Sequence, residues 1–170
     1  MEELFSVPPG LEARISTSLY ALPRIDLVIQ IRRSAIVNRS DRQMFDLVND
    51  IEAYPARFAW CADARVLERS DDALTARLEV RIAGVSQAFT TRNTLEPPRS
   101  IGMQLVEGPF RALSGGWTFA ALGDAGCKVA LALDFEYAGR LMAPLMRAGF
   151  EKLADRMVDE FCREAERDRS

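Results

Sequence analysis

Two pairs of carboxylates stand close enough in the sequence to suggest acid–base chemistry. Asp50 precedes Glu52 by two residues, and Asp134 precedes Glu136 by two. Carboxylate pairs hydrolyse glycosidic bonds when one member acts as acid and the other as base or nucleophile. Asp134 and Glu136 alternate with apolar residues, which predicts that they face solvent, and Asp50 follows Asn49 at an expected helix end, where such residues cap or turn. We therefore predict that neither pair is catalytic.

Histidine is absent from the 170-residue chain, and cysteine occurs only three times. The absence of histidine removes the commonest general base and the usual zinc ligand, which weakens the standard hydrolase mechanisms. Cys61, Cys127 and Cys162 are far apart and odd in number, which favours free thiols in a reducing compartment. The sequence thus predicts a cytoplasmic protein with no metal site, no catalytic residues and no cofactor other than a bound ligand.

A third group of polar residues is predicted to point inward. Gln87, Thr91 and Asn93 alternate with the apolar Phe89 and Leu95, so all five should share one face of a strand. A buried amide or hydroxyl left unpaired costs about 1 to 3 kcal/mol. These groups either bond to the backbone or to water, or they contact polar atoms of a ligand, since a few polar groups in an apolar cleft orient small molecules.

Composition indicates one soluble domain. Hydrophobic residues make up 48%, charged residues 28%, and the net charge is -3, so no general attraction to DNA is expected. No apolar run approaches the roughly 20 residues that a membrane-spanning helix needs. Residues 1–26 contain Pro8-Pro9-Gly10 and are predicted to form an N-terminal extension. Residues 27–168 are predicted to form a single domain.

The first regular elements are a strand and a helix. Residues 27–37 are rich in β-branched side chains and predict a strand. Ser40 or Asp41 can cap a helix that follows, because a short polar side chain accepts the free backbone N–H groups of the first turn. We expect this helix to end at Tyr54-Pro55, since the residue before proline is disfavoured in the α region.

The rest of the chain alternates with period two and then changes to helical spacing. Strands are predicted at 64–70, 74–84, 85–96, 100–108, 112–122 and 126–139, with connections short enough for antiparallel pairing. Gly115-Gly116 is predicted to bend its strand so that Trp117 can pack. Residues 140–168 predict one long amphipathic helix. The expected fold is α+β: a curved antiparallel sheet of six to seven strands wrapped around a long C-terminal helix, with short helices after the first strand.

Four segments carry a resemblance to a known family: "NDIEAYPARFAWC", "FTTRNTL", "EGPFRALSGGWTF" and "LDFEY". Together they resemble the bacterial ribosome association toxins and the similar coenzyme Q-binding proteins, within the START-like, helix-grip superfamily. The resemblance runs from about Ile31 to about Glu164. It implies a helix-grip fold with a deep apolar cavity between sheet and terminal helix, and it implies no catalytic residues.

The cavity residues follow from the inward face of the strands and of the terminal helix. The resemblance and the alternation together predict that they bind a hydrophobic ligand. Methionine is flexible, so several methionines on the helix would let the cavity adapt to its contents. The predicted ligand-binding residues are Phe58, Trp60, Val80, Ile82, Phe89, Thr91, Met103, Leu105, Trp117, Phe119, Leu131, Leu133, Phe135, Met142, Met146 and Phe150.

Three aromatic residues suggest an entrance to this cavity. Phe58, Trp60 and Phe110 fall in segments that Pro55 and Pro109 should keep irregular, and loops at the surface often carry function. We expect these three residues to form a mobile apolar gate, through which a lipid passes when the protein touches a membrane.

The resemblance, taken with these features, implies non-enzymatic binding of ubiquinone, another polyprenyl quinone or a lipid. The protein would support quinone handling in respiration from the cytoplasm, with peripheral contact to the inner membrane. A first alternative is a toxin-like inhibitor of ribosomal subunit association that binds the large subunit. A second is a polyketide cyclase/dehydratase-like enzyme, which the missing histidine and missing inward acid disfavour. Arginines that could contact the ribosome are Arg32, Arg33, Arg39, Arg42, Arg163, Arg167 and Arg169.

Overall fold

The computed structural model describes residues 28–138 and 144–167. The predicted extension at 1–26 lies outside these residues, as do Met142 and Arg169, so the predicted domain boundary stays a prediction.

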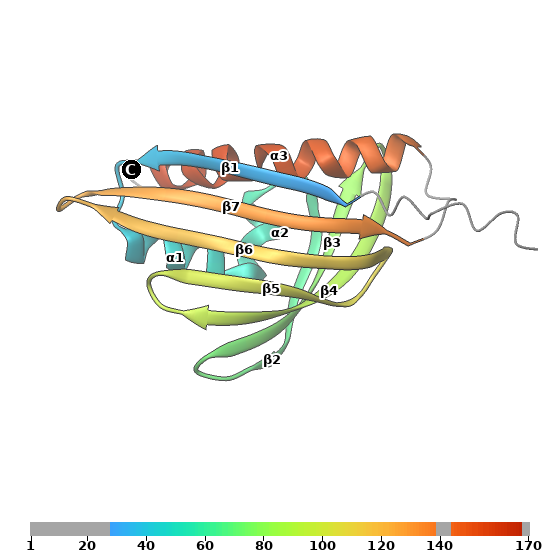
Figure 1. Ribbon diagram of the computed structural model, residues 1–170, viewed down its shortest axis with the longest axis horizontal. Helices are drawn as coiled ribbons and strands as arrows, with labels where there is room; N and C mark the ends of the chain where they lie inside the picture. The colour runs from blue at the N-terminus through green and yellow to red at the C-terminus, as the bar shows by residue number, and fades with distance from the viewer. Residues whose placement is uncertain (1–27, 139–143, 168–170) are drawn as a thin grey trace, which may run out of the picture.

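One seven-stranded antiparallel sheet forms the body of the protein (Figure 1). Its strand order is β1-β7-β6-β5-β4-β3-β2, so six strands form a meander and β1 joins its far edge. The pairing of β1 with β7 runs from Ile29 opposite Phe135 to Val37 opposite Cys127. The strands are β1 (Ile29–Val37), β2 (Cys61–Arg69), β3 (Ala73–Ile82), β4 (Val85–Glu96), β5 (Ser100–Glu107), β6 (Phe110–Leu122) and β7 (Gly126–Tyr137).

The first helix begins as predicted but ends early. In α1 (Asp41–Asn49), the Ser40 side chain accepts from the Gln43 backbone N–H and the Gln43 side chain accepts from the Ser40 N–H, which forms a capping box. The short 3-10 helix η1 (Ile51–Ala53) follows.

The expectation that Tyr54-Pro55 ends the helix is wrong. Tyr54 itself is helical, with φ -56° and ψ -42°, and it begins α2 (Tyr54–Arg57). Pro55 lies in the first turn of α2, where a missing N–H costs no hydrogen bond. The buried Tyr54 hydroxyl donates to the Val48 carbonyl and holds the residue in place.

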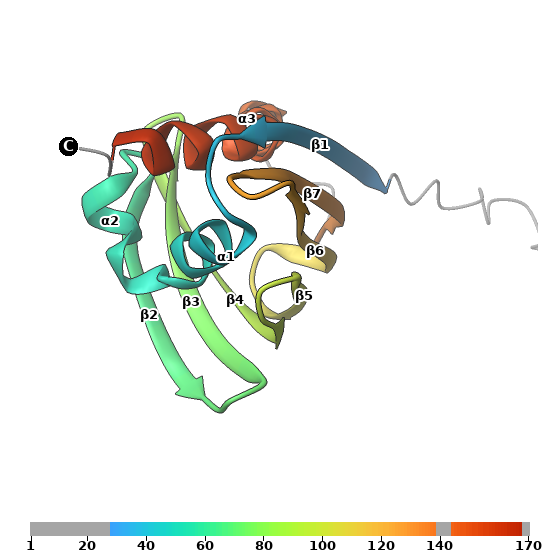
Figure 2. The same cartoon turned by 90° about the vertical axis from the view of Figure 1, so that its left-hand side faces the viewer.

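The long helix α3 (Pro144–Arg167) lies across the open side of the curled sheet, and α1 and α2 fill one end (Figure 2). Met146, Phe150, Leu153 and Phe161 are buried along one stripe, which confirms the predicted amphipathic helix. The structure therefore confirms the α+β fold with a curved sheet around a C-terminal helix. Within the part of the chain that the structure describes, no helix is both long and apolar enough to cross a membrane.

Polar contacts fix α3 to both edges of the sheet. Asp155 of α3 pairs with Arg33 on β1, the strand at one edge. Glu160 of α3 accepts a hydrogen bond of 2.7 Å from the indole Nε1 of Trp60, which lies just before β2 at the other edge. The helix α3 thus connects the two edges of the sheet, at β1 and beside β2.

Candidate ligand-binding site

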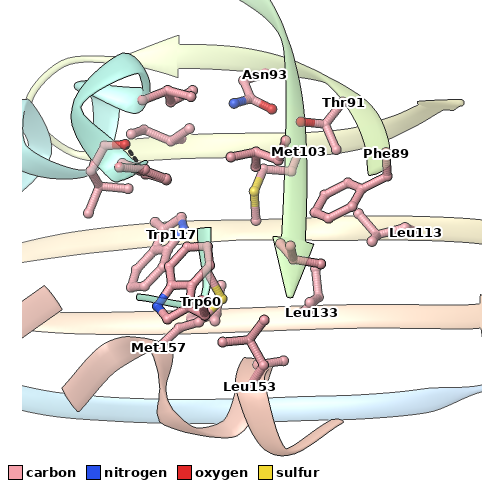
Figure 3. A pocket seen from close by; sticks show the side chains of 18 of the residues that line it. Trp60, Phe89, Thr91, Asn93, Met103, Leu113, Trp117, Leu133, Leu153 and Met157 are labelled. Carbon is pink, nitrogen blue, oxygen red and sulfur yellow. Dashed lines mark hydrogen bonds between the residues drawn. The ribbon is translucent and has the colours of Figure 1, made fainter. Parts of the chain in front are cut away.

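A mostly apolar cavity lies between the sheet and α3 (Figure 3). Its side chains come from α1, η1, α2, the segment before β2, strands β3 to β7 and α3. The space that these side chains enclose measures about 780 Å³ when it is counted out to the protein surface. The centre of a water-sized sphere can reach only about 60 Å³ of this space. Because one water needs roughly 10 to 15 Å³ by this measure, the cavity has room for a few waters or one small group.

Nine of the sixteen predicted ligand-binding residues line this cavity: Trp60, Val80, Phe89, Thr91, Met103, Trp117, Leu131, Leu133 and Phe150. Whether they bind a ligand stays a prediction.

Six further predicted residues pack elsewhere in the core, without lining the cavity: Phe58, Ile82, Leu105, Phe119, Phe135 and Met146. Phe135, for example, is enclosed by the rings of Phe110, Tyr137 and Phe150. Alternation predicts which face of a strand a side chain takes, but it does not predict which of those side chains meet one another and which border a void.

The three aromatics expected to form one gate lie in two separate clusters. Phe58 stacks on Trp60 with ring centroids 5.2 Å apart, and it also packs on Phe161 of α3. Phe110 instead packs on Phe150, with centroids 4.8 Å apart. Phe150 and Phe161 are roughly 16 Å apart along α3 at 1.5 Å per residue. All three predicted gate residues are buried, so a single surface gate made of them is wrong.

Local backbone structure explains why these three aromatic side chains are buried. Pro55 starts a short helix instead of leaving an exposed loop, and the Phe58 backbone after it is extended, so the aromatic side chains turn into the core. Phe110 is the first residue of β6 and is held by strand pairing opposite Tyr137.

Polar side chains gather at one end of the cavity. Thr91 and Asn93 of β4 are both buried, at 3% and 5% exposure, and both line it. In Figure 3 they lie on the opposite side of the cavity from Leu153 and Met157 of α3. Gln87, which the strand alternation grouped with them, does not line the cavity.

Asn49 is a further polar residue of the cavity, and it was missed by the sequence reasoning, which assigned it to a helix terminus. It lies in the last turn of α1 and lines the cavity. Its position four residues after the buried Phe45 was the available signal, because residues spaced by four share a helix face. The Oδ1 atoms of Asn49 and Asn93 are both buried, and neither has a hydrogen-bond partner among the residues that the structure describes.

The described residues that line the cavity carry few ionisable groups. None of these side chains belongs to aspartate, glutamate, lysine, arginine or cysteine. Tyr54 lines the cavity, but burial raises the pKa of its phenol far above the usual range, so the hydroxyl stays protonated and donates to the Val48 carbonyl. The described residues also contain no cluster of histidine, cysteine, aspartate or glutamate suited to a metal ion.

The carboxylates considered for acid–base chemistry lie outside the cavity. Asp134 pairs with Arg32 on the neighbouring strand at 2.6 Å, and Asp50 pairs with Arg57 of α2 at 3.0 Å. Both are partly exposed ion pairs that join neighbouring elements.

Comparison with known proteins agrees with this fold. The family model for polyketide cyclase/dehydrase and lipid transport matches residues 37–162. The ribosome association toxin RatA of Pseudomonas aeruginosa is 46% identical over 135 residues, which cover 79% of this chain and 94% of that protein. RatA of Escherichia coli K12 is 42% identical, over 78% of this chain and 84% of that protein.

Solved structures show the same architecture. The ZhuI aromatase/cyclase of a Streptomyces species has a TM-score of 0.73 at 21% identity, covering 83% of this chain and 95% of its own. An 18 kDa protein of Caulobacter crescentus has a TM-score of 0.65 at 25% identity, covering 82% of this chain and 97% of its own. The chain belongs to the polyketide cyclase/dehydrase and lipid transport family and is a relative of the RatA proteins.

Proposed function

We propose that this protein is a non-enzymatic binding protein for a hydrophobic ligand, a polyprenyl quinone or similar lipid, and that it supports quinone handling in respiration. The observation that carries the proposal is the cavity between sheet and α3, which is apolar along most of its wall and polar at one end. Ligand sites in proteins commonly combine such a wall with a few polar groups that fix orientation.

The cavity is narrow, so binding of a polyprenyl ligand has to enlarge it. A polyprenyl chain does not fit into about 60 Å³. Met103 and Met157 line the cavity from opposite sides, and methionine side chains repack more easily than branched ones. We expect these two side chains, together with a small outward shift of α3, to make room for the ligand.

Peripheral contact with a membrane is supported by exposed apolar side chains at one end of the molecule. Val28 precedes β1, Val85 begins β4 and Leu145 lies in the first turn of α3; they are 45%, 48% and 66% exposed. The starts of these three elements lie toward the same end in Figure 1. Flotation with vesicles should therefore weaken on Leu145→Ser and not on Leu67→Ser, a change at an exposed leucine of β2.

A matched pair of helix variants tests ligand binding in the cavity. Ala154 of α3 is buried and lines the cavity, whereas Ala148 of the same helix is exposed. Ala154→Leu should fill the cavity, and Ala148→Leu should leave it open. Gently purified protein is extracted with organic solvent, and the extract is analysed by mass spectrometry. Stoichiometric quinone or lipid from the wild type and from Ala148→Leu, but not from Ala154→Leu, is the expected result; an empty wild-type extract contradicts the proposal.

A second candidate function is inhibition of ribosomal subunit association by binding the large subunit. It is favoured by the 46% identity to a protein named ribosome association toxin, over nearly its whole length. Sedimentation of ribosomal subunits with and without this protein tests it: separate subunits at low salt, and reassociation as salt weakens the contact, would support this function.

The arginines proposed for that contact are mostly engaged within the protein. Arg39 donates from Nε to the Ala165 carbonyl at 2.7 Å, and Arg163 is exposed. Ribosome binding through the paired arginines would have to replace their intramolecular ion pairs. These pairs are Arg32 with Asp134, Arg33 with Asp155, Arg42 with Asp46 and Arg167 with Glu164.

A further inference from the structure

The cavity contains hydrogen-bond acceptors that the described residues do not satisfy. Asn93 Oδ1 and Asn49 Oδ1 are buried, and neither has a hydrogen-bond partner within residues 28–138 and 144–167. The strand neighbours of Asn93 cannot help, because Leu74 lies opposite it on β3 and Met103 lies opposite it on β5. A donor for the Asn93 oxygen therefore has to come from within the cavity.

We propose that the amide oxygens of Asn93 and Asn49, which line the same cavity, select an apolar ligand carrying a hydroxyl group; for a polyprenyl quinone, this is the reduced, dihydroxy form. The proposal rests on the hydrophobic-ligand function above and names the chemistry that the cavity prefers. An amide oxygen only accepts hydrogen bonds, whereas a hydroxyl group can donate one. The carbonyl of an oxidised quinone has no hydrogen to donate and leaves both oxygens unpaired.

The same arrangement sets the orientation of the ligand. Asn93 and Thr91 of β4 lie on one side of the cavity, and Leu153 and Met157 of α3 border the opposite side (Figure 3). The hydroxyl-bearing head thus lies deep against the sheet, and the apolar tail lies toward α3. Thr91, beside Asn93 on the same face of β4, supplies a hydroxyl that can donate to the ligand oxygen in return.

Two small probes that differ in one hydroxyl group test this inference. Isothermal titration calorimetry compares 4-butylphenol with butylbenzene. In a purely apolar cavity butylbenzene binds more tightly, because the phenol loses its hydrogen bonds to water. We expect the wild type to bind 4-butylphenol with a dissociation constant about tenfold lower than that of butylbenzene, which corresponds to the free energy of about one hydrogen bond. Asn93→Leu should reverse this preference, and Thr94→Leu, at the exposed neighbour on β4, should not.

Asn49→Leu provides an independent variant, so the test does not depend on one substitution; thermal unfolding confirms that each protein is folded. If the wild type binds neither probe, the hydrophobic-ligand function fails and this inference fails with it. If the wild type binds butylbenzene as tightly as 4-butylphenol or more tightly, ligand binding stands and the head-group site is overturned. A preference for 4-butylphenol that survives both asparagine substitutions also overturns it.

Discussion

Replacing Asn93 by leucine should make the protein more stable while it weakens binding of a hydroxyl-bearing ligand. Asn93 is 5% exposed, and its buried Oδ1 has no hydrogen-bond partner in the described part of the chain. Leucine has a similar size, cannot leave a polar atom unpaired, and faces a cavity rather than a filled core. The substitution thus removes a desolvation penalty without overpacking.

The expected gain follows from that penalty. An unpaired buried polar group costs about 1 to 3 kcal/mol, so the free energy of unfolding should rise by about that amount. With a denaturant dependence of about 2 kcal/mol per molar urea, the unfolding midpoint should rise by about 0.5 to 1.5 M. The melting temperature should rise by about 2 to 12 °C, since each kcal/mol shifts the melting temperature of a domain of this size by about 2 to 4 °C.

Urea unfolding followed by tryptophan fluorescence measures this change, because Trp60 and Trp117 are both buried and both line the cavity. The control is Thr94→Leu on the exposed face of the same strand, which should change the free energy of unfolding by less than about 0.5 kcal/mol. A midpoint for Asn93→Leu well below that of the control would refute the reasoning, since it would mean that the Asn93 amide stabilises the folded sheet.

Two further predictions concern a glycine and a thiol. A Cβ atom at Gly115 would lie 2.0 Å from the Ala132 carbonyl oxygen of β7, so Gly115→Ala should lower the free energy of unfolding in urea by several kcal/mol. The control is Gly123→Ala, where a Cβ meets nothing within 4 Å and only the backbone strain of roughly 1 to 2 kcal/mol is expected. Equal losses in the two variants would contradict this. Burial first, and then nearby Asp159, raises the pKa of the Cys162 thiol to about 11. At pH 8 only about one thousandth of it is thiolate, so iodoacetamide should label the native protein slowly, with a rate that rises with pH toward 11; rapid labelling at pH 8 would show that the thiol is not shielded.

Periodicity along the chain was enough to predict most of the fold. In β7, Val129, Leu131, Leu133 and Phe135 alternate with polar or small residues, and all four are buried. The stripe along α3 is equally regular, and Ser40 caps α1 as its residue type predicts. These features are local: each depends on residues that are two to four positions apart, so the sequence displays them directly. β2 begins at Cys61, three residues before its predicted start.

Other features depended on contacts between distant residues. The conformation of Tyr54 is one, because local sterics disfavour a helical residue before proline, and burial together with the bond to the Val48 carbonyl outweighs that preference. The division of the aromatics into two clusters is another, since it depends on which ring of α3 each one meets.

Local patterns along the chain thus sufficed to predict the strands, the terminal helix and the inward direction of Thr91 and Asn93. Three features emerge only when distant elements pack together: β1 pairs with β7 across about a hundred residues, Asn49 of α1 and Asn93 line one cavity, and neither amide oxygen finds a hydrogen-bond partner among the described residues. The physical reason is that secondary structure follows from neighbours along the chain, whereas a cavity and the hydrogen bonds missing from it are properties of how separate elements fit together.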